Sequence, residues 1–232
     1  MPWLVWHSLL GQKVRESDAL KVRNLMPCRG IRCLDGAIPV LVNLLTSEDV
    51  LTQDNAVTSI LNLSIYENNK GLIMLAGAIP SIVQVLRSGT MEARENVAAT
   101  LFSLSLADKN KIIIGASGAI HALVELLQNG SPRGKKDAAT VLFNLCIYQG
   151  NKGGAIRAGI ITTLLKMLTD SSKSMVDEAL TIMSVLASHQ EAKAAFVKAD
   201  TIPILINLLR TGLPRNKENA IAILLALCKR DA

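Results

Sequence analysis

The chain has 232 residues, half of them apolar and only 3% aromatic, so its core must be built mainly from leucine, isoleucine, valine and alanine. The formal net charge is +6, but the basic residues are dispersed and aromatics are scarce, which argues against nucleic-acid binding. No apolar run approaches the length of a membrane span, so we expect no membrane insertion.

The first 35 residues differ from the rest of the chain. They hold both tryptophans and two of the four cysteines, and they follow only poorly the period that begins at Gly36. Two apolar clusters, within 4–10 and 14–25, indicate two helices. No basic leading segment or small-residue cleavage site is present, so we expect no secretory signal. We interpret residues 1–35 as a degenerate N-terminal capping repeat, or as sequence altered relative to related chains.

From Gly36 onward the sequence repeats every 41 residues. A motif that first reads Gly-Ala-Ile-Pro begins at positions 36, 77, 118, 159 and 200. Three further markers keep the same step: Asn-Lys pairs that start at Asn69, small residues that start at Ala56, and leucines that start at Leu63. This register without insertions predicts five stacked repeats. Their bounds are 36–76, 77–117, 118–158, 159–199 and 200–232.

Each repeat contains three helix signals. A short helix over about 70–75 ends before Gly77, since glycine is a natural helix terminator. A second helix begins near Pro80, and a Ser-Gly-Thr break at 88–90 separates it from a long third helix over about 91–106. Three helices in 41 residues are typical of the armadillo repeat. We therefore predict an all-α, right-handed superhelical solenoid.

The outward residues of the third helices form the candidate binding groove. In armadillo arrays these helices line the concave face, and positions three or four apart share a helix face. Amides and hydroxyls there can bond an extended partner backbone, and cations there can meet acidic or phosphorylated segments. We call the following residues the third-helix ladder: Asn55, Thr58, Asn62, Asn96, Ser103, Arg133, Lys136, Asp137, Thr140, Asn144, Glu178, Thr181 and Arg215. Ordinary solvated side chains are the alternative interpretation at each position.

We identify no catalytic, metal-binding or cofactor-binding set in the sequence. The three histidines lie at unrelated repeat positions, and no paired carboxylates stand out. Cys28 and Cys33 lack further metal ligands nearby. Cys146 and Cys228 share a repeat position otherwise held by serine and alanine, which predicts small core residues. The stretch 130–136, GSPRGKK, is one residue short of a phosphate-binding loop and follows a helix, so nucleotide binding is not expected.

Three stretches carry a more specific signal: LSIYENNK at 63–70, GTMEARENVAATLFSLS at 89–105 and PRGKKDAA at 132–139. They closely resemble the armadillo region of plant U-box E3 ubiquitin ligases of the spotted-leaf-like group, a resemblance that covers residues 36–231. It implies a substrate-recognition array for ubiquitylation, in a cytosolic or nuclear protein of defence, cell-death or hormone signalling.

The U-box, which recruits the ubiquitin-charged E2 enzyme in that family, has no counterpart that we identify in these residues. This stretch alone is therefore not expected to transfer ubiquitin, and an E2 partner is implied only if a U-box lies elsewhere in the full-length protein. The chain is then a fragment of a U-box protein, a gene-model product, or a free armadillo protein that competes for substrate.

Two alternatives share the fold: a free-standing armadillo scaffold or adaptor, and a nuclear import receptor. Import receptors carry a tryptophan four residues before each groove asparagine, which stacks on cargo lysines. This chain has Thr58, Ala99, Thr140, Thr181 and Ala222 at those positions. The import alternative is therefore the weaker one.

Overall fold

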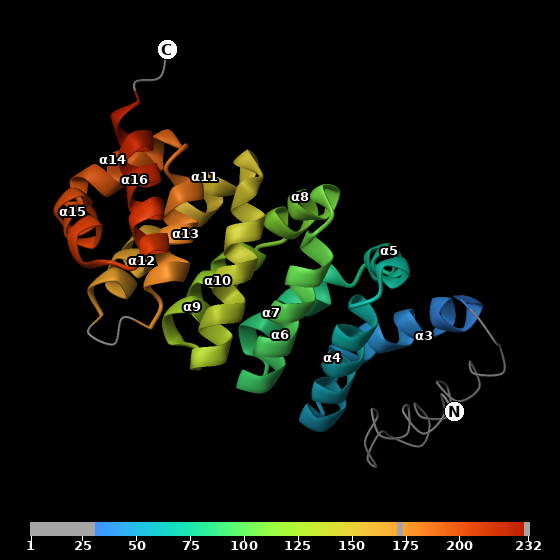
Figure 1. The fold of residues 1–232 in the computed structure, drawn as a ribbon. Coiled ribbons are helices and arrows are strands. Elements are labelled where there is room, and N and C mark those ends of the chain that lie inside the picture. Colours follow the sequence, from blue (N-terminus) through green and yellow to red (C-terminus); the bar gives the residue numbers. More distant parts are fainter. Residues whose placement is uncertain (1–30, 171–173, 230–232) are drawn as a thin grey trace. The chain divides into compact units, whose positions relative to one another are not determined.

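The computed structural model describes residues 31–170 and 174–229, with side chains from residue 36 onward. These residues form fourteen helices and no strands, labelled α3 to α16 in Figure 1. The chain divides into two compact units between Asn110 and Lys111. None of the helices in these ranges is long and apolar enough to cross a bilayer by itself, although the bent pairs α5–α6 and α8–α9 pass on combined length and composition.

The first unit is built from two layers of helices. It contains α3 (Ile31–Leu44), α4 (Val50–Ser64), α5 (Glu67–Leu75), α6 (Ile79–Ser88), α7 (Met91–Ser105) and the start of α8 (Asp108–Ala116). Helix α3 packs on α4, and α6 packs on α7. The long helices α4 and α7 lie side by side (Figure 1). The repeat period therefore brings equivalent positions of neighbouring third helices together.

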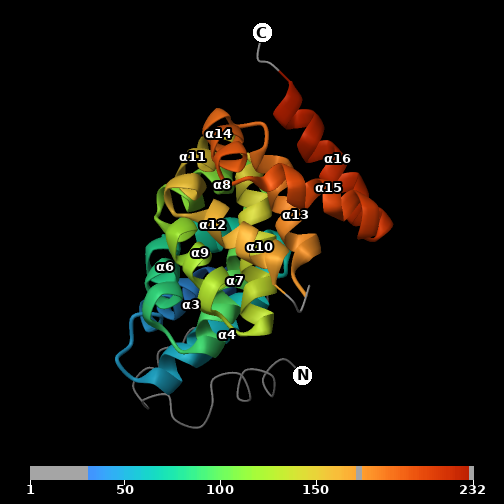
Figure 2. The same cartoon turned by 90° about the vertical axis from the view of Figure 1, so that its left-hand side faces the viewer.

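The second unit repeats the same packing. Its helices are α9 (Ala119–Asn129), α10 (Pro132–Ile147), α11 (Gln149–Arg157), α12 (Ile160–Thr169), α13 (Val176–Leu186), α14 (Gln190–Lys198), α15 (Thr201–Thr211) and α16 (Pro214–Cys228). The pairs α9–α10, α12–α13 and α15–α16 are each a second and third helix in contact. Helix α13 packs between α10 and α16, and Figure 2 shows α10 and α13 side by side.

The strongest sequence marker is a left-handed turn between the first and second helix of a repeat. Gly77, Gly118 and Gly159 have φ values of 68°, 85° and 84°. Glycine adopts this conformation without the steric cost that a Cβ atom brings. Asp200 takes the equivalent place with φ 53°, which aspartate tolerates better than most residues. The recurring glycine is therefore explained by backbone geometry.

Three of the five third helices, α4, α7 and α10, start at side-chain caps that the sequence-based prediction missed. The capping oxygens belong to Asp49, Thr90 and Ser131, and they accept from the backbone N–H groups of Thr52, Ala93 and Gly134. Each cap satisfies a donor that has no partner within the helix. The three caps are 41 residues apart, so they fix the same starting point for α4, α7 and α10 and hence the positions of the outward side chains on these helices.

The recurring asparagine of the Asn-Lys marker is structural. The amide nitrogens of Asn69, Asn110 and Asn151 donate to the carbonyl oxygens of Leu63, Leu104 and Leu145, at 3.1, 2.8 and 2.9 Å. These carbonyls lie near the C-terminal end of the third helix, where backbone acceptors lack partners within the helix. The asparagine thus joins the first helix of one repeat to the third helix that precedes it.

The small-residue positions that the repeat predicts to be buried are buried in the structure, except for one of the cysteines. The small-residue position is buried at Ala56, Val97, Ala138, Ala179 and Ala220. Cys146 is buried as predicted, but Cys228 is exposed, so the prediction of a core residue at Cys228 is wrong. The side chain lies at the end of α16, and no described helix follows to cover it.

The N-terminal boundary also differs from the turn seen in the other repeats. Helix α3 runs continuously from Ile31 through Gly36 to Leu44 and contains Pro39. The predicted division between residues 35 and 36 therefore falls inside a helix. Residues 1–30, including Cys28, lie outside the described residues, so the capping repeat remains a prediction.

Candidate partner-binding surface

The structure places the thirteen ladder residues on the five third helices. In the first unit α4 carries Asn55, Thr58 and Asn62, and α7 carries Asn96 and Ser103. In the second unit α10 carries Arg133, Lys136, Asp137, Thr140 and Asn144, α13 carries Glu178 and Thr181, and α16 carries Arg215. Each unit thus presents its own part of the ladder on adjacent long helices.

Exposure separates the ladder residues into three groups. Arg133, Lys136, Thr140 and Arg215 are exposed, and Asn55, Thr58, Asn62, Ser103, Asp137, Glu178 and Thr181 are half-buried. Asn96 and Asn144 are only 7% and 8% exposed. These two asparagines therefore offer little surface to a partner, although they occupy the same repeat positions as the half-buried Asn55 and Asn62.

In the first unit two ladder side chains join α7 to α4. The amide nitrogen of Asn96 donates to the hydroxyl oxygen of Thr58 at 3.4 Å. The hydroxyl of Ser103 donates to the carbonyl oxygen of Ser64 at 2.5 Å. Ser103 has then used its only proton, so toward a partner it can act only as an acceptor. Asn55 and Asn62 are half-buried, so they are the more accessible ladder amides of this unit.

The cationic part of the ladder is concentrated on α10. Arg133 forms an i,i+4 ion pair with Asp137, with its Nε 3.6 Å from the carboxylate oxygen. Such exposed pairs contribute little to stability because water screens them, but the pair reduces the local positive charge. Lys136 is exposed on the same helix, whereas α13 carries Asp177 and Glu178 in its first turn. The ladder of the second unit is therefore mixed in charge.

An apolar feature beside the ladder was missed from the sequence. In the first unit Ile65, Tyr66 and Leu106 are 65%, 66% and 53% exposed, and Leu61 and Phe102 are half-buried. We call these five residues the apolar ledge. The second unit has Phe143, Ile147 and Tyr148 at equivalent repeat positions. The signal was present in the 41-residue register, as an apolar residue two positions after each recurring leucine at 63, 104 and 145.

The titration behaviour of the buried thiol fits a structural role. Burial raises the pKa of the Cys146 thiol to about 12, and the nearby charge of Lys152 offsets part of that rise. Burial also lowers the pKa of Lys152, whose ammonium donates to the hydroxyl of Ser188 at 2.6 Å. A thiol held protonated is a poor nucleophile. Within the described ranges no three His, Cys, Asp or Glu side chains gather as a metal site.

Comparison with known proteins supports the same architecture. The chain matches the family described as "Plant U-box protein ARM repeat region" over residues 29–232. In fold it is similar to the designed armadillo repeat protein YIII(Dq.V1)4CPAF in complex with peptide (KR)4, with a TM-score of 0.75 and 23% sequence identity. That likeness covers 95% of this chain and 97% of the designed one. The predicted armadillo solenoid is confirmed.

Curated relatives share shorter stretches. The chain is 86% identical over 35 residues to U-box domain-containing protein 11 of Arabidopsis thaliana, which covers 15% of this chain and 6% of that protein. It is 46% identical over 65 residues to U-box domain-containing protein 1 of Medicago truncatula, and this stretch covers 26% of this chain and 9% of that protein. The matched stretches thus span less than a tenth of either relative. Because the family match covers most of the sequence, this chain belongs to the family of plant U-box protein armadillo repeat regions.

Proposed function

We propose that this chain is the partner-binding array of a plant U-box-type protein and holds a segment of its protein partner on the outward faces of its third helices. The family match over residues 29–232 carries the proposal. A designed armadillo protein of similar fold forms a complex with peptide (KR)4, which supports a peptide-binding use of such an array. In this role the chain selects a substrate for ubiquitylation in the cytosol or nucleus.

The ladder supplies the polar contacts in this proposal. In the first unit the half-buried Thr58 and Asn62 lie on α4, which packs on α7, and in the second unit the exposed Thr140 lies on α10, which packs on α13. An extended segment that crosses these helices presents a backbone group to each of them in turn. The E2 enzyme is a partner only through a U-box elsewhere in the full-length protein. A free-standing armadillo adaptor is the second candidate, and the same surface serves it.

Site-specific photo-crosslinking tests the binding face. Benzoylphenylalanine is placed at Thr58 or Thr140 on the ladder, and in control proteins at Gln84 or His121, which are exposed on the second helices α6 and α9. After exposure to plant extract, we expect protein adducts several-fold more often at the ladder positions. Equal labelling at the two sets, or labelling confined to the second helices, would contradict the proposal.

A further inference from the structure

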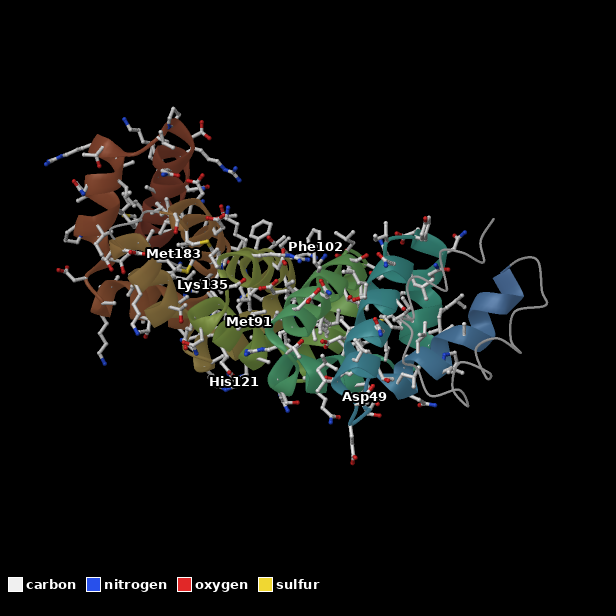
Figure 3. The ribbon with its side chains drawn as sticks, turned by 90° about the horizontal axis from the view of Figure 1, so that it is seen from below. Asp49, Met91, Phe102, His121, Lys135 and Met183 are labelled. Carbon is white, nitrogen blue, oxygen red and sulfur yellow. The ribbon has the colours of Figure 1, made fainter. Side chains whose placement is uncertain are left out.

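The apolar ledge is a continuous surface rather than a set of scattered side chains. Leu61 and Ile65, like Phe102 and Leu106, are four residues apart, so each pair lies on one side of the end of its helix. The hydrogen bond from Ser103 to the carbonyl of Ser64 holds the C-terminal ends of α7 and α4 against each other. Figure 3 shows Phe102 at one edge of this unit and Asp49 at the opposite edge.

The part of the first unit whose side chains the structure describes carries an excess of negative charge. Residues 36–110 contain seven carboxylates and four cations, whereas the whole chain has a formal net charge of +6. The carboxylates are Glu48, Asp49, Asp54, Glu67, Glu92, Glu95 and Asp108, and the cations are Lys70, Arg87, Arg94 and Lys109. This excess of negative charge sits on the same unit as the ledge.

The cations nearest the binding face are engaged within the unit. The guanidinium Nε of Arg94 donates to the carbonyl oxygen of Leu86 at 3.0 Å, at the end of α6. The ammonium of Lys70 bonds to Glu67 at 2.6 Å and its side chain is largely buried. The carboxylate of Asp54 accepts from the hydroxyl of Thr90, and Glu92 is exposed at the start of α7. Within the described residues, the N-terminal halves of α4 and α7 are therefore acidic, and the apolar ledge lies at the C-terminal ends of the same two helices.

We infer that the first unit binds a partner segment that carries both leucine-sized side chains and lysine or arginine. This inference rests on the proposed partner-binding function and adds the chemistry of the segment. The ledge removes the apolar side chains from water, which supplies affinity. The carboxylates favour the basic side chains and disfavour acidic ones, which supplies selectivity and orientation. The half-buried amide of Asn62, which follows Leu61 on α4, can bond the segment's backbone.

The second unit provides an internal contrast. Phe143, Ile147 and Tyr148 repeat the apolar part of the ledge, but α10 carries Arg133, Lys135 and Lys136. The apolar edge is thus common to both units, whereas the excess of negative charge belongs to the first. A segment that needs both features is therefore expected to bind the first unit.

Three synthetic ten-residue peptides test the chemistry against the full chain, with dissociation constants from fluorescence anisotropy. The first alternates leucine, lysine and serine; the second replaces every leucine with serine; the third replaces every lysine with glutamate. We expect the leucine–lysine peptide to bind at least tenfold more tightly than either other peptide. Equal binding of the serine peptide would show that the ledge does not contribute to binding, and equal binding of the glutamate peptide would show that the carboxylates do not. Either result overturns the inference, as does a lack of binding by all three.

Variants locate the site. Ile65→Ser with Leu106→Ser is expected to weaken the leucine–lysine peptide at least tenfold, and Glu92→Lys severalfold. The matched control, Leu75→Ser with Ile113→Ser, removes two exposed apolar side chains away from the ledge and is expected to leave binding unchanged. Circular dichroism confirms that each variant is folded. Ladder adducts in plant extract without binding of the leucine–lysine peptide would overturn this inference and leave the proposed function standing.

Discussion

The side-chain amide of Asn151 donates a 3.0 Å hydrogen bond to the backbone carbonyl of Lys111, forty residues earlier in the chain. The same nitrogen donates to the carbonyl of Leu145 at 2.9 Å. Asn151 is buried near the start of α11, so one side chain joins this helix to both α8 and α10. The asparagine of the repeat is thus a connector between helices.

Replacing Asn151 with alanine is expected to lower the free energy of unfolding by about 2–3 kcal/mol, because two buried carbonyl groups lose a donor. Urea unfolding followed by far-UV circular dichroism measures the change. Asn129→Ala is the control, since Asn129 is exposed at the end of α9, and its effect is expected to stay within about 0.5 kcal/mol. Similar losses in the two variants would show that the connector has no special role.

Gly115 and Gly71 form a matched pair for the same contact. A Cβ atom on Gly115 would overlap the side-chain amide of Asn151, whereas a Cβ atom on Gly71 would meet nothing within 4 Å. Both glycines lie in first helices. Gly115→Ala is therefore expected to destabilise the protein, and Gly71→Ala to stabilise it by up to about 1 kcal/mol through helix propensity. Thermal melts of the two variants check the opposite signs; a stabilised Gly115→Ala protein would contradict the crowding.

The repeat register and the order of helices could be predicted from the sequence because each depends on local chemistry. Gly77 and its equivalents need a left-handed backbone, and Pro80 is tolerated in the first turn of a helix. Because each requirement selects a particular residue type, that residue type recurs in the sequence at the spacing of the repeat. The same register also placed the ladder residues on the third helices, since periodicity determines which side of a single helix a residue occupies.

Exposure within the ladder could not be predicted in the same way. Asn62 and Asn144 share a repeat position and a residue type, yet Asn62 is half-buried and Asn144 is buried. Their accessibility depends on the side chains of the helices packed around each one, which helix periodicity does not encode. The prediction that Cys228 is buried was wrong for a related reason, because the burial of a side chain depends on the helices packed beside it. Cys228 is exposed at the end of α16. The apolar ledge was missed because exposed apolar residues are common singly and acquire meaning only when they are adjacent in space.

That difference gives a second test on the ladder. Asn62→Ala is expected to change the free energy of unfolding by less than about 0.5 kcal/mol, whereas Asn144→Ala is expected to lower it by about 1–3 kcal/mol because a buried amide is removed. Urea unfolding of both variants under identical conditions provides the comparison. Loss of partner capture in Asn62→Ala would then report on binding, while the same loss in Asn144→Ala would include unfolding. Equal stabilities would contradict the burial difference.

The buried thiol predicts a dependence of stability on alkaline pH. The pKa of Cys146 in the folded protein is about 12, above its ordinary value of 9.0, because burial disfavours the thiolate. As pH rises above 9.0 the unfolded chain releases this proton while the folded protein retains it, so the free energy of unfolding falls between these two values. At pH ~10 the loss from this group is on the order of 1 kcal/mol.

Cys146→Ser isolates this contribution. The lowered pKa of Lys152 acts with the opposite sign, because its charge is disfavoured in the folded state and stability therefore rises as pH increases toward its ordinary value of 10.5. Lys152 is present in both proteins, so its contribution largely cancels when the wild-type and Cys146→Ser unfolding curves are compared across the same pH series. The wild-type protein is expected to lose stability more steeply above pH ~9, and Cys228→Ser, which changes an exposed thiol, is expected to keep the wild-type slope. Parallel curves for wild type and Cys146→Ser would mean that the thiol is solvated in the folded protein.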